Sequence, residues 1–192
     1  AAGIASGGFQ NTYGGGTYDA ILVKFDASGN RLWATYFGYN NNDAAYSIAI
    51  DHSGNVYLAG GTSSNSGIAS GGFQNTFGGG SYDAFLVKFD ASGNRLWATY
   101  YGGTGWEEAH GVSTDTAGNV YLAGFTNSTA GIASGGFQNT YGGGTYDSFL
   151  AKFDSAGNRI WATYYGGAGD EGYDGNSVCT DNSGNIYLSG WT

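Results

Sequence analysis

Short runs rich in β-branched and aromatic residues alternate with polar segments along the whole chain. In the first third of the sequence these runs cover residues 20–25, 32–37, 46–50 and 56–59. Runs this short predict β-strands, because an amphipathic helix needs a longer apolar periodicity. The sequence therefore predicts an all-β protein built from short strands.

The segments inside the hairpins share the pattern D-x-[SA]-G-N, which occurs six times. The Asp side chain can accept hydrogen bonds from its own turn and the Gly supplies a positive φ, so each copy predicts a hairpin turn. The pattern lacks the further carboxylates of an EF-hand loop, and it departs from the sialidase-type Asp box. The predicted turn residues are Asp26, Gly29, Asp51, Gly54, Asp90, Gly93, Asp115, Gly118, Asp154, Gly157, Asp181 and Gly184.

The chain repeats itself with a spacing of 64 residues, since the segment 3–12 recurs at 67–76 and at 131–140. The third copy differs in length by a two-residue insertion. Each copy holds two hairpins, joined by a short link on one side and by a Gly-rich loop on the other. Copies this alike indicate one structural unit used three times rather than three domains. We expect one propeller segment, 1–192, with the repeats 1–64, 65–128 and 129–192.

Four-stranded antiparallel sheets repeated in tandem predict the blades of a β-propeller. The second copy carries GFQNTFGGG at 72–80, DAFLVKFD at 83–90, WATYYGG at 97–103 and GNVYLAG at 118–124. This pattern resembles the SBBP family of bacterial β-propeller repeats, and the resemblance covers all three copies. It implies a propeller, usually of seven blades, in large secreted or surface proteins. Family members often carry Pro before the Phe-Gln turn, where this chain has Ala-Ser-Gly-Gly, which predicts a less rigid loop.

By analogy with related propellers, the third run of each copy is the innermost strand of a blade and the second run is the outermost. All six turns then share one face, and the Gly-rich loops and the links between blades share the opposite face. Loops on a rigid scaffold usually carry binding. The links differ most between copies. This variation either tunes ligand recognition or reflects sequence drift on a solvated loop. The candidate ligand-binding residues are Tyr39, Asp43, Trp106, Glu107, Glu108, His110 and Tyr173.

The second link holds the densest group of reactive side chains. Trp106 beside Glu107 and Glu108 suits sugar binding, and carboxylates about 5 to 9 Å apart can cleave a glycosidic bond. Adjacent glutamates point apart more often than together, however, and the other copies lack an equivalent group, so we expect no enzyme. We expect no cofactor, with calcium as the alternative at the acidic third link. The metal candidates there are Asp170, Glu171 and Asp174.

Composition and charge narrow the range of partners. Six basic against 15 acidic residues give a net charge of -9, which would repel a phosphate backbone and argues against nucleic acid. No apolar run approaches the roughly 20 residues that span a bilayer. Apolar residues make up 41% of the chain and charged residues 11%, which predicts a packed core rather than disorder.

Several repeated side chains are predicted to be architectural. One Lys and one Trp recur in the outer hairpin of each copy, and we expect the lysines to pair with carboxylates or reach the sheet edge. We expect the tryptophans to pack between blades. A single cysteine, Cys179, excludes an internal disulfide and is expected to be packed like its equivalents Ala49 and Ser113. The repeated residues are Lys24, Lys88 and Lys152, and Trp33, Trp97 and Trp161.

Three units cannot close a ring alone, because propellers need about four to eight blades. The first half-blade, 19–37, and the last half-blade, 176–190, are complementary, so we expect pairing with another copy or with blades of a longer parent chain. The sequence starts Ala1-Ala2 without Met, which leaves open a processed product, an excerpt or an engineered piece.

The expected function is that of a non-catalytic extracellular or cell-surface segment with a structural, adhesive or assembly role. A carbohydrate-binding module that uses the long-loop face is the alternative. A glycoside hydrolase or lyase is the third.

Overall fold

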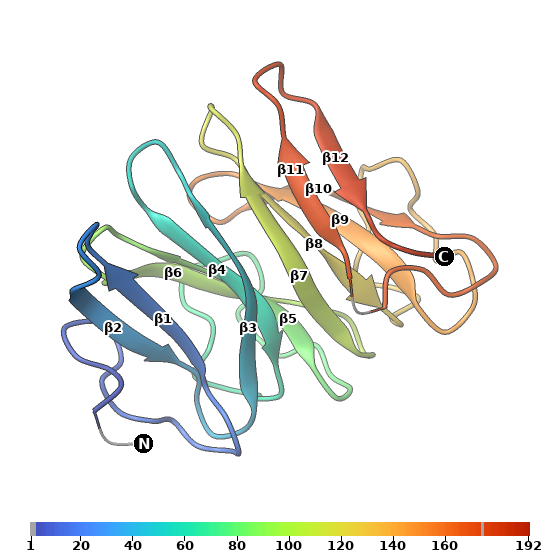
Figure 1. The fold of residues 1–192 in the computed structure, drawn as a ribbon. Helices are drawn as coiled ribbons and strands as arrows, with labels where there is room; N and C mark the ends of the chain where they lie inside the picture. Colours follow the sequence, from blue (N-terminus) through green and yellow to red (C-terminus); the bar gives the residue numbers. More distant parts are fainter. Residues whose placement is uncertain (1–2, 174) are drawn as a thin grey trace.

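The computed structural model describes residues 3–173 and 175–192. Within these ranges every regular element is a β-strand, and no helix could cross a membrane. The predicted all-β class is therefore confirmed (Figure 1). The strands are β1 (Ala20–Phe25), β2 (Arg31–Phe37), β3 (Asp43–Ile50), β4 (Val56–Thr62), β5 (Asp83–Phe89), β6 (Arg95–Tyr101), β7 (Glu107–Thr114), β8 (Val120–Thr126), β9 (Asp147–Phe153), β10 (Arg159–Tyr165), β11 (Ser177–Thr180) and β12 (Ile186–Ser189).

The strands form two central sheets of four strands and a two-stranded sheet at either end. The central sheets have the orders β3-β4-β5-β6 and β10-β9-β8-β7, and all pairs are antiparallel. β1 pairs with β2, and β11 pairs with β12. The sheets fan out in Figure 1, with β3, β7 and β11 in contact. Four-stranded antiparallel sheets arranged in this way are consistent with a propeller, and the described residues do not form a closed ring.

Hydrogen bonds join β3 to β7 and β7 to β11, which have corresponding positions in successive sheets. Thr114 Oγ1 donates to the Ile50 carbonyl at 3.1 Å, and Thr180 Oγ1 donates to the Thr114 carbonyl at 2.9 Å. These three strands therefore lie next to one another, β3 beside β7 and β7 beside β11. Cys179 in β11 is nevertheless exposed. The expectation that it is packed is wrong, because no further inner strand lies beyond β11 among the described residues.

Two strands extend beyond the predicted runs. β4 continues through Gly60 and Gly61, and β3 begins at Asp43 rather than at residue 46. A Cβ on Gly60 would lie 1.8 Å from the Ala44 carbonyl oxygen. Glycine therefore permits a close approach of the two backbones instead of ending the strand.

The D-x-[SA]-G-N segments form the hairpin turns, as one example shows. Asp115 Oδ1 accepts hydrogen bonds from the Ala117 and Asn119 N–H groups at 2.9 and 2.8 Å. Asp115 Oδ2 accepts from the Asn119 amide at 2.7 Å and from the Tyr121 hydroxyl at 2.9 Å. Gly118 has a φ of 84°. Burial alone would raise the pKa of Asp115, but these hydrogen bonds hold that pKa below its usual value.

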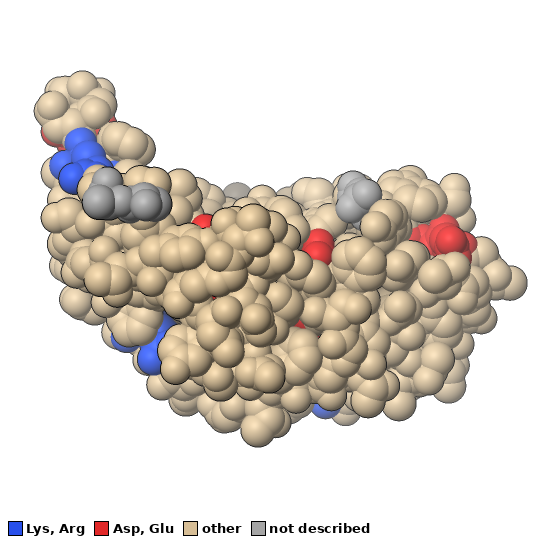
Figure 2. Space-filling view, turned by 90° about the horizontal axis from the view of Figure 1, so that it is seen from below, with Lys and Arg blue, Asp and Glu red and all other residues tan. Residues whose placement is uncertain are grey.

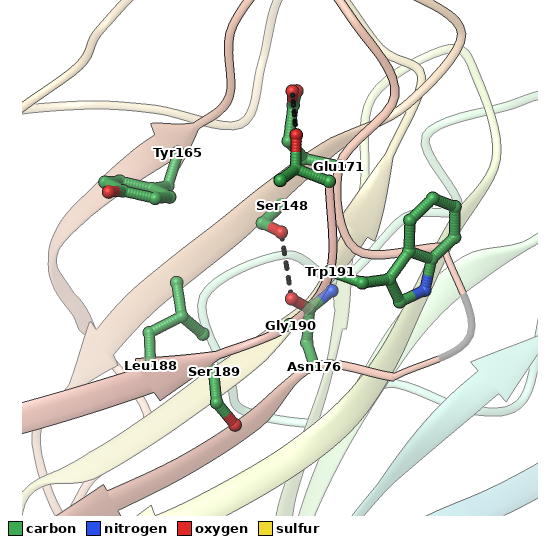
Figure 3. Close-up of a pocket in the computed structure, with 9 residues that line it drawn as sticks. Ser148, Tyr165, Glu171, Asn176, Leu188, Ser189, Gly190 and Trp191 are labelled. Atoms are coloured by element: carbon green, nitrogen blue, oxygen red, sulfur yellow. Dashed lines mark hydrogen bonds between the residues drawn. The ribbon is translucent and has the colours of Figure 1, made fainter.

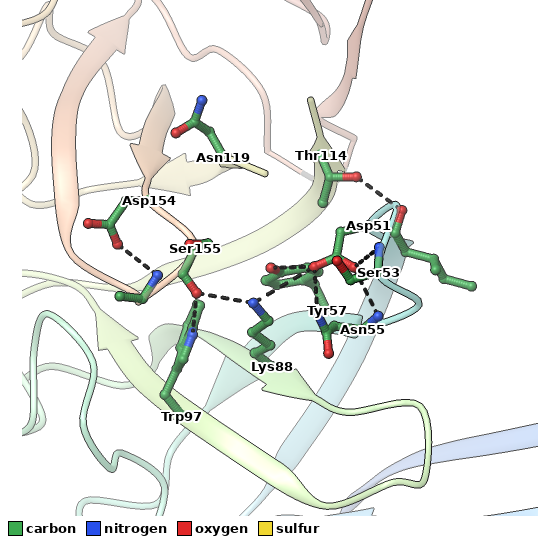
Figure 4. Close-up of polar contacts among 12 residues, drawn as sticks. Asp51, Ser53, Asn55, Tyr57, Lys88, Trp97, Thr114, Asn119, Asp154 and Ser155 are labelled. Carbon is green, nitrogen blue, oxygen red and sulfur yellow. Dashed lines mark hydrogen bonds and ion pairs between the residues drawn. The ribbon is translucent and has the colours of Figure 1, made fainter. Parts of the chain in front are cut away.

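A hairpin turn of the second central sheet contacts Lys and Trp side chains of the first central sheet (Figure 4). Trp97 Nε1 and Lys88 Nζ both donate to the Ser155 carbonyl, each at 3.1 Å. Lys88 Nζ also lies 3.8 Å from Asp51 Oδ2. The indole ring covers Gly157, where a Cβ would lie 2.9 Å from Trp97 Cδ2. A hairpin turn of one sheet is thereby fixed to the outer strands of the sheet before it.

An equivalent contact joins the β1–β2 sheet to the β3–β6 sheet. Lys24 Nζ and Trp33 Nε1 donate to the Ala91 carbonyl at 2.9 and 3.1 Å, and the Trp33 ring covers Gly93. Packing of the tryptophans between sheets is confirmed for Trp33 and Trp97.

Replacing Asp115 by Ala should lower the free energy of unfolding by roughly 1 to 3 kcal/mol at about pH 7, because it removes hydrogen bonds to a charged acceptor. The pKa of this carboxyl is lower in the folded than in the unfolded chain. Its contribution is therefore present above the unfolded pKa of about 4 and is lost as the pH falls below it. Urea unfolding at a series of pH values measures this loss.

The matched control is Asp26→Ala, in the exposed turn of the first sheet, which should cost less. A difference between Asp115→Ala and the wild type that persists unchanged below about pH 3 would contradict the assignment.

Candidate functional site

The adjacent glutamates at the start of β7 point to opposite sides of their sheet. Side chains alternate along a strand. Glu107 Oε1 accepts from Thr126 Oγ1 at 2.6 Å, whereas Glu108 Oε1 accepts from Trp106 Nε1 at 3.0 Å. Both glutamates are buried. They therefore belong to different clusters and do not face a common glycosidic bond.

An aromatic cluster surrounds Trp106, one of the candidate ligand residues. The Trp106 ring centroid lies 6.0 Å from Tyr82, 5.8 Å from Phe125, 6.2 Å from Tyr146 and 6.0 Å from Tyr173. The Tyr146 and Tyr173 rings stack at 4.7 Å. The cluster consists of these five residues, of which Phe125 lies in β8 and the other four lie in the loops and links between strands. Trp106 is only partly exposed and is packed by its neighbours rather than presented as an open platform.

Glu108 connects this cluster to its polar neighbours. Its carboxylate accepts from Trp106 and lies 3.3 Å from His110 Nε2. A Cβ on Gly61 would lie 2.7 Å from Glu108 Cγ, so glycine makes room for this side chain. Burial and then the negative charge of Glu108 raise the pKa of Tyr46. The predicted group of Trp106, Glu108 and His110 is brought together, and its members bond mainly to one another.

Three carboxylate pairs lie at the links between sheets. In the central pair, a Cβ on Gly102 would lie 2.6 Å from Asp83 Oδ1 and 2.7 Å from Glu107 Oε2. Asp83 Oδ2 accepts from the Gly78 N–H at 2.7 Å. Asp83 Oδ1 has no hydrogen-bond partner in the described part of the chain. The carboxylate pairs are Asp19 with Asp43, Asp83 with Glu107, and Asp147 with Glu171.

Burial dominates the electrostatics of these pairs. It raises the pKa of Asp83 to about 7, and the negative charge of Glu107 adds to the effect, against a hydrogen bond from Gly78 that lowers it. Burial also raises the pKa of Glu107 and of Asp147. Within the described residues, the ion pairs are those of Lys88 with Asp51 and His110 with Glu108. Neither supplies a positive charge to a carboxylate pair.

The remaining predicted residues are dispersed. Tyr39 covers Gly67, where a Cβ would lie 2.5 Å from its ring. Asp170 accepts from a loop N–H, and Glu171 joins a carboxylate pair. Asp174 lies outside the described residues. No group of three or more His, Cys, Asp or Glu side chains that could hold a metal occurs in residues 3–173 and 175–192.

Asp19, Asp83 and Asp147 are not among the predicted site residues. Each follows a Tyr at the same place of its copy, and this recurrence of a charged residue at a strand start was the available signal. Figure 2, which views the molecule from below Figure 1, shows acidic atoms only as small separate patches. Most carboxylates of the pairs are recognised from their burial, since Asp43, Asp83, Glu107 and Asp147 are 0% exposed.

Comparison with known proteins supports the repeat character of the chain. Residues 32–67 match the family model described as a beta-propeller repeat, SBBP. The chain is 29% identical over 144 residues to the regulatory protein FlaEY of Caulobacter vibrioides, which covers 74% of this chain and 15% of the relative. It is 27% identical over 153 residues to an uncharacterized WD repeat-containing protein, L264, of Acanthamoeba polyphaga mimivirus, with coverages of 72% and 10%. The chain thus spans a small part of the length of both relatives.

Replacing Gly102 by Ala should lower the free energy of unfolding by roughly 1 to 3 kcal/mol, because the added carbon would overpack a buried site. Gly167→Ala is the matched control, since its nearest neighbour would lie 3.6 Å away. That change should alter stability by less than about 0.5 kcal/mol. Urea unfolding measures the free energy of unfolding of both variants. Equal losses of stability would contradict the tight packing of carboxylates against Gly102.

Proposed function

We propose that this chain, whose residues 32–67 match the SBBP beta-propeller repeat, is a non-catalytic propeller segment of three 64-residue repeats. Its role is structural, adhesive or assembly-forming, in a secreted or cell-surface protein. The observation that carries the proposal is that the two end sheets are complementary halves of one four-stranded sheet. β1 and β2 correspond to the outer pair, and β11 and β12 correspond to the inner pair (Figure 1).

The edge of β12 is the first part of this complementarity. In the central sheets the equivalent strands pair on both sides, for example Val120 of β8 with Phe153 of β9. Among the described residues β12 pairs with β11 alone. In the register of the central sheets, Ile186 of β12 would face Phe25 of a β1 strand. An open strand edge of this kind favours pairing with another strand.

Apolar side chains at the two ends also match. Tyr101 at the end of β6 is buried and packs on Phe153 of the next sheet, with ring centroids 5.7 Å apart. The equivalent of Tyr101 in the last four-stranded sheet is Tyr165, which is 60% exposed. The equivalent of Phe153 in the first sheet is Phe25, which is 59% exposed. Docking the first sheet after the last would bury both rings.

A ring and a guanidinium provide a second match. Arg159 lies over the Phe73 ring, 4.4 Å from its centroid. Phe137 occupies the same place one repeat later and is 87% exposed. The arginine that would cover Phe137 is Arg31 of the first sheet. This pair would add a cation–π contact to the apolar burial.

The contact of Lys and Trp side chains with a hairpin-turn carbonyl is a further match between the two ends of the chain. Lys152 and Trp161 are the equivalents of Lys88 and Trp97, and the described residues contain no outer hairpin after them whose turn they could contact. The carbonyl in the position of Ser155 is that of Ala27, in the exposed turn between β1 and β2. The pocket of Figure 3 lies at this end, between the last four-stranded sheet and β12.

Each of these contacts occurs inside the chain, which supports using the same surfaces between molecules. Two copies would complete six four-stranded sheets. Because the chain spans 15% of one relative and 10% of the other, blades of a longer parent chain are the alternative occupant. Solution mass of the isolated chain separates the two, since a self-completing pair has twice the mass of 19.8 kDa.

Tyr165→Asp should shift the isolated chain from oligomer to monomer in analytical ultracentrifugation, because a charge would be buried at the junction. Ile160→Asp is the matched control on the same strand. Ile160 is 52% exposed, and its equivalent Leu96 is 53% exposed inside the chain, so this position lies outside the junction. A wild-type chain that is monomeric at all concentrations would refute self-assembly.

Cys179 supplies an independent measurement. Its equivalent Ala49 is half-buried against the core of the next sheet, so a second copy would cover the thiol with its β3 strand. Reaction with a thiol reagent should be several-fold slower in the assembled wild type than in monomeric Tyr165→Asp. Equal rates would contradict the proposed junction.

Glycan binding is a second candidate function. It is favoured by partly exposed aromatic rings beside Glu108: Tyr46 is 49% exposed, and Tyr18, 43% exposed, shares a hydrogen bond with Tyr82 at 3.1 Å. Screening on a glycan array tests it, with Tyr46→Ala as the surface variant. Reproducible binding that is lost in this variant would favour the carbohydrate-binding role over a purely structural one.

A further inference from the structure

Three carboxylate oxygens that are buried share an unusual property. Oδ1 of Asp19, of Asp83 and of Asp147 has no hydrogen-bond partner among the described residues. The side chains of Asp83 and Asp147 are fully buried, at 0% exposure. Leaving a buried acceptor unpaired is unfavourable, and more so when it is charged. The same oxygen is unpaired at all three links, which indicates a common missing partner.

Each unpaired oxygen lies beside a second carboxylate oxygen. At the third link, a Cβ on Gly166 would lie 2.5 Å from Asp147 Oδ1 and 2.7 Å from Glu171 Oε2. The first and second links have the same arrangement around Gly38 and Gly102. The two oxygens of a pair therefore lie against the same glycine, and an ion between them would need oxygen distances of about 2.3 to 2.6 Å if it is Ca²⁺.

The surrounding hydrogen bonds favour ionised carboxylates. Asp83 Oδ2 accepts from the Gly78 N–H and from the Gln74 amide at 2.7 and 3.2 Å. Glu107 accepts from Thr126 Oγ1 at 2.6 Å and from the Gly103 N–H at 2.9 Å. Donors to a carboxylate stabilise its charged form. A positive charge between the two oxygens would satisfy both groups, whereas a shared proton would require one of them to be neutral.

We propose that each carboxylate pair binds a divalent metal ion, with Ca²⁺ as the best fit. All the donors are oxygens, which select hard cations. Two carboxylates leave further positions for water or backbone carbonyls, and Ca²⁺ tolerates such irregular sites better than Mg²⁺ does. Asp83 lies in β5 and Glu107 in β7, so the ion joins one sheet to the next. Both ligands come from one chain, and the proposal is independent of assembly.

Calorimetric titration of the full chain, first treated with a chelator, tests the proposal. We expect three Ca²⁺ per chain, in line with the three pairs. We also expect the melting temperature to rise by roughly 5 to 10 °C for each occupied site at about 100 times the dissociation constant. No heat of binding and no rise in melting temperature would overturn the proposal.

Asp83→Asn should reduce the stoichiometry from three to two, and Asp147→Asn should do the same at its own link. Asp90→Asn is the matched control, because Asp90 accepts hydrogen bonds within its own turn from Ser92 and Asn94. It should keep three sites. Unchanged stoichiometry in Asp83→Asn would overturn the assignment.

Stability in the presence of the chelator gives a second readout. Asp83→Asn should fold at least as well as the wild type there, because the amide removes a charge repulsion. If this variant is stabilised while the wild type binds no Ca²⁺, the pair shares a proton and the proposal fails.

Discussion

The contact of a hairpin-turn carbonyl with a Lys and a Trp fixes both central four-stranded sheets to the sheet before them. The Ser155 carbonyl accepts from both Lys88 and Trp97, and the indole covers the next glycine of the same turn. The direction of that carbonyl is set by Asp154, which accepts from the Ala156 and Asn158 N–H groups. The Asp-Gly turn therefore shapes the hairpin and also orients the sheet that packs on it.

This dependence on a following sheet explains the difference between the middle and the ends of the molecule. Tyr101 and Tyr165 have the same residue type in the same strand position, yet one is buried and the other is 60% exposed. The stability of repeat architectures is a sum of unit and nearest-neighbour terms. An end sheet lacks the interface energy with one neighbour. Its exposed apolar side chains are those that a further sheet would cover.

The local elements and the packing of the tryptophans between sheets could be predicted from the sequence, but most other contacts between sheets could not. The strand runs and the Asp-Gly turns depend on residues within a few positions of one another. The pairing of Asp83 with Glu107 depends instead on how a link carries the chain from β5's sheet to β7. Likewise, the separation of Glu107 from Glu108 follows only once the start of β7 is known, and the exposure of Cys179 depends on a neighbour beyond β11.

The distribution of charge connects these observations. The chain has six basic residues against 15 acidic ones. The basic side chains serve the sheet contacts: Lys88 binds Asp51 and a turn carbonyl, and Arg159 covers an aromatic ring. Within the described residues no Lys or Arg forms an ion pair with a carboxylate pair, so a proton or an ion from solution is the remaining source of a balancing charge. Because each pair joins two sheets, the ion concentration would then control how rigidly the sheets are held together.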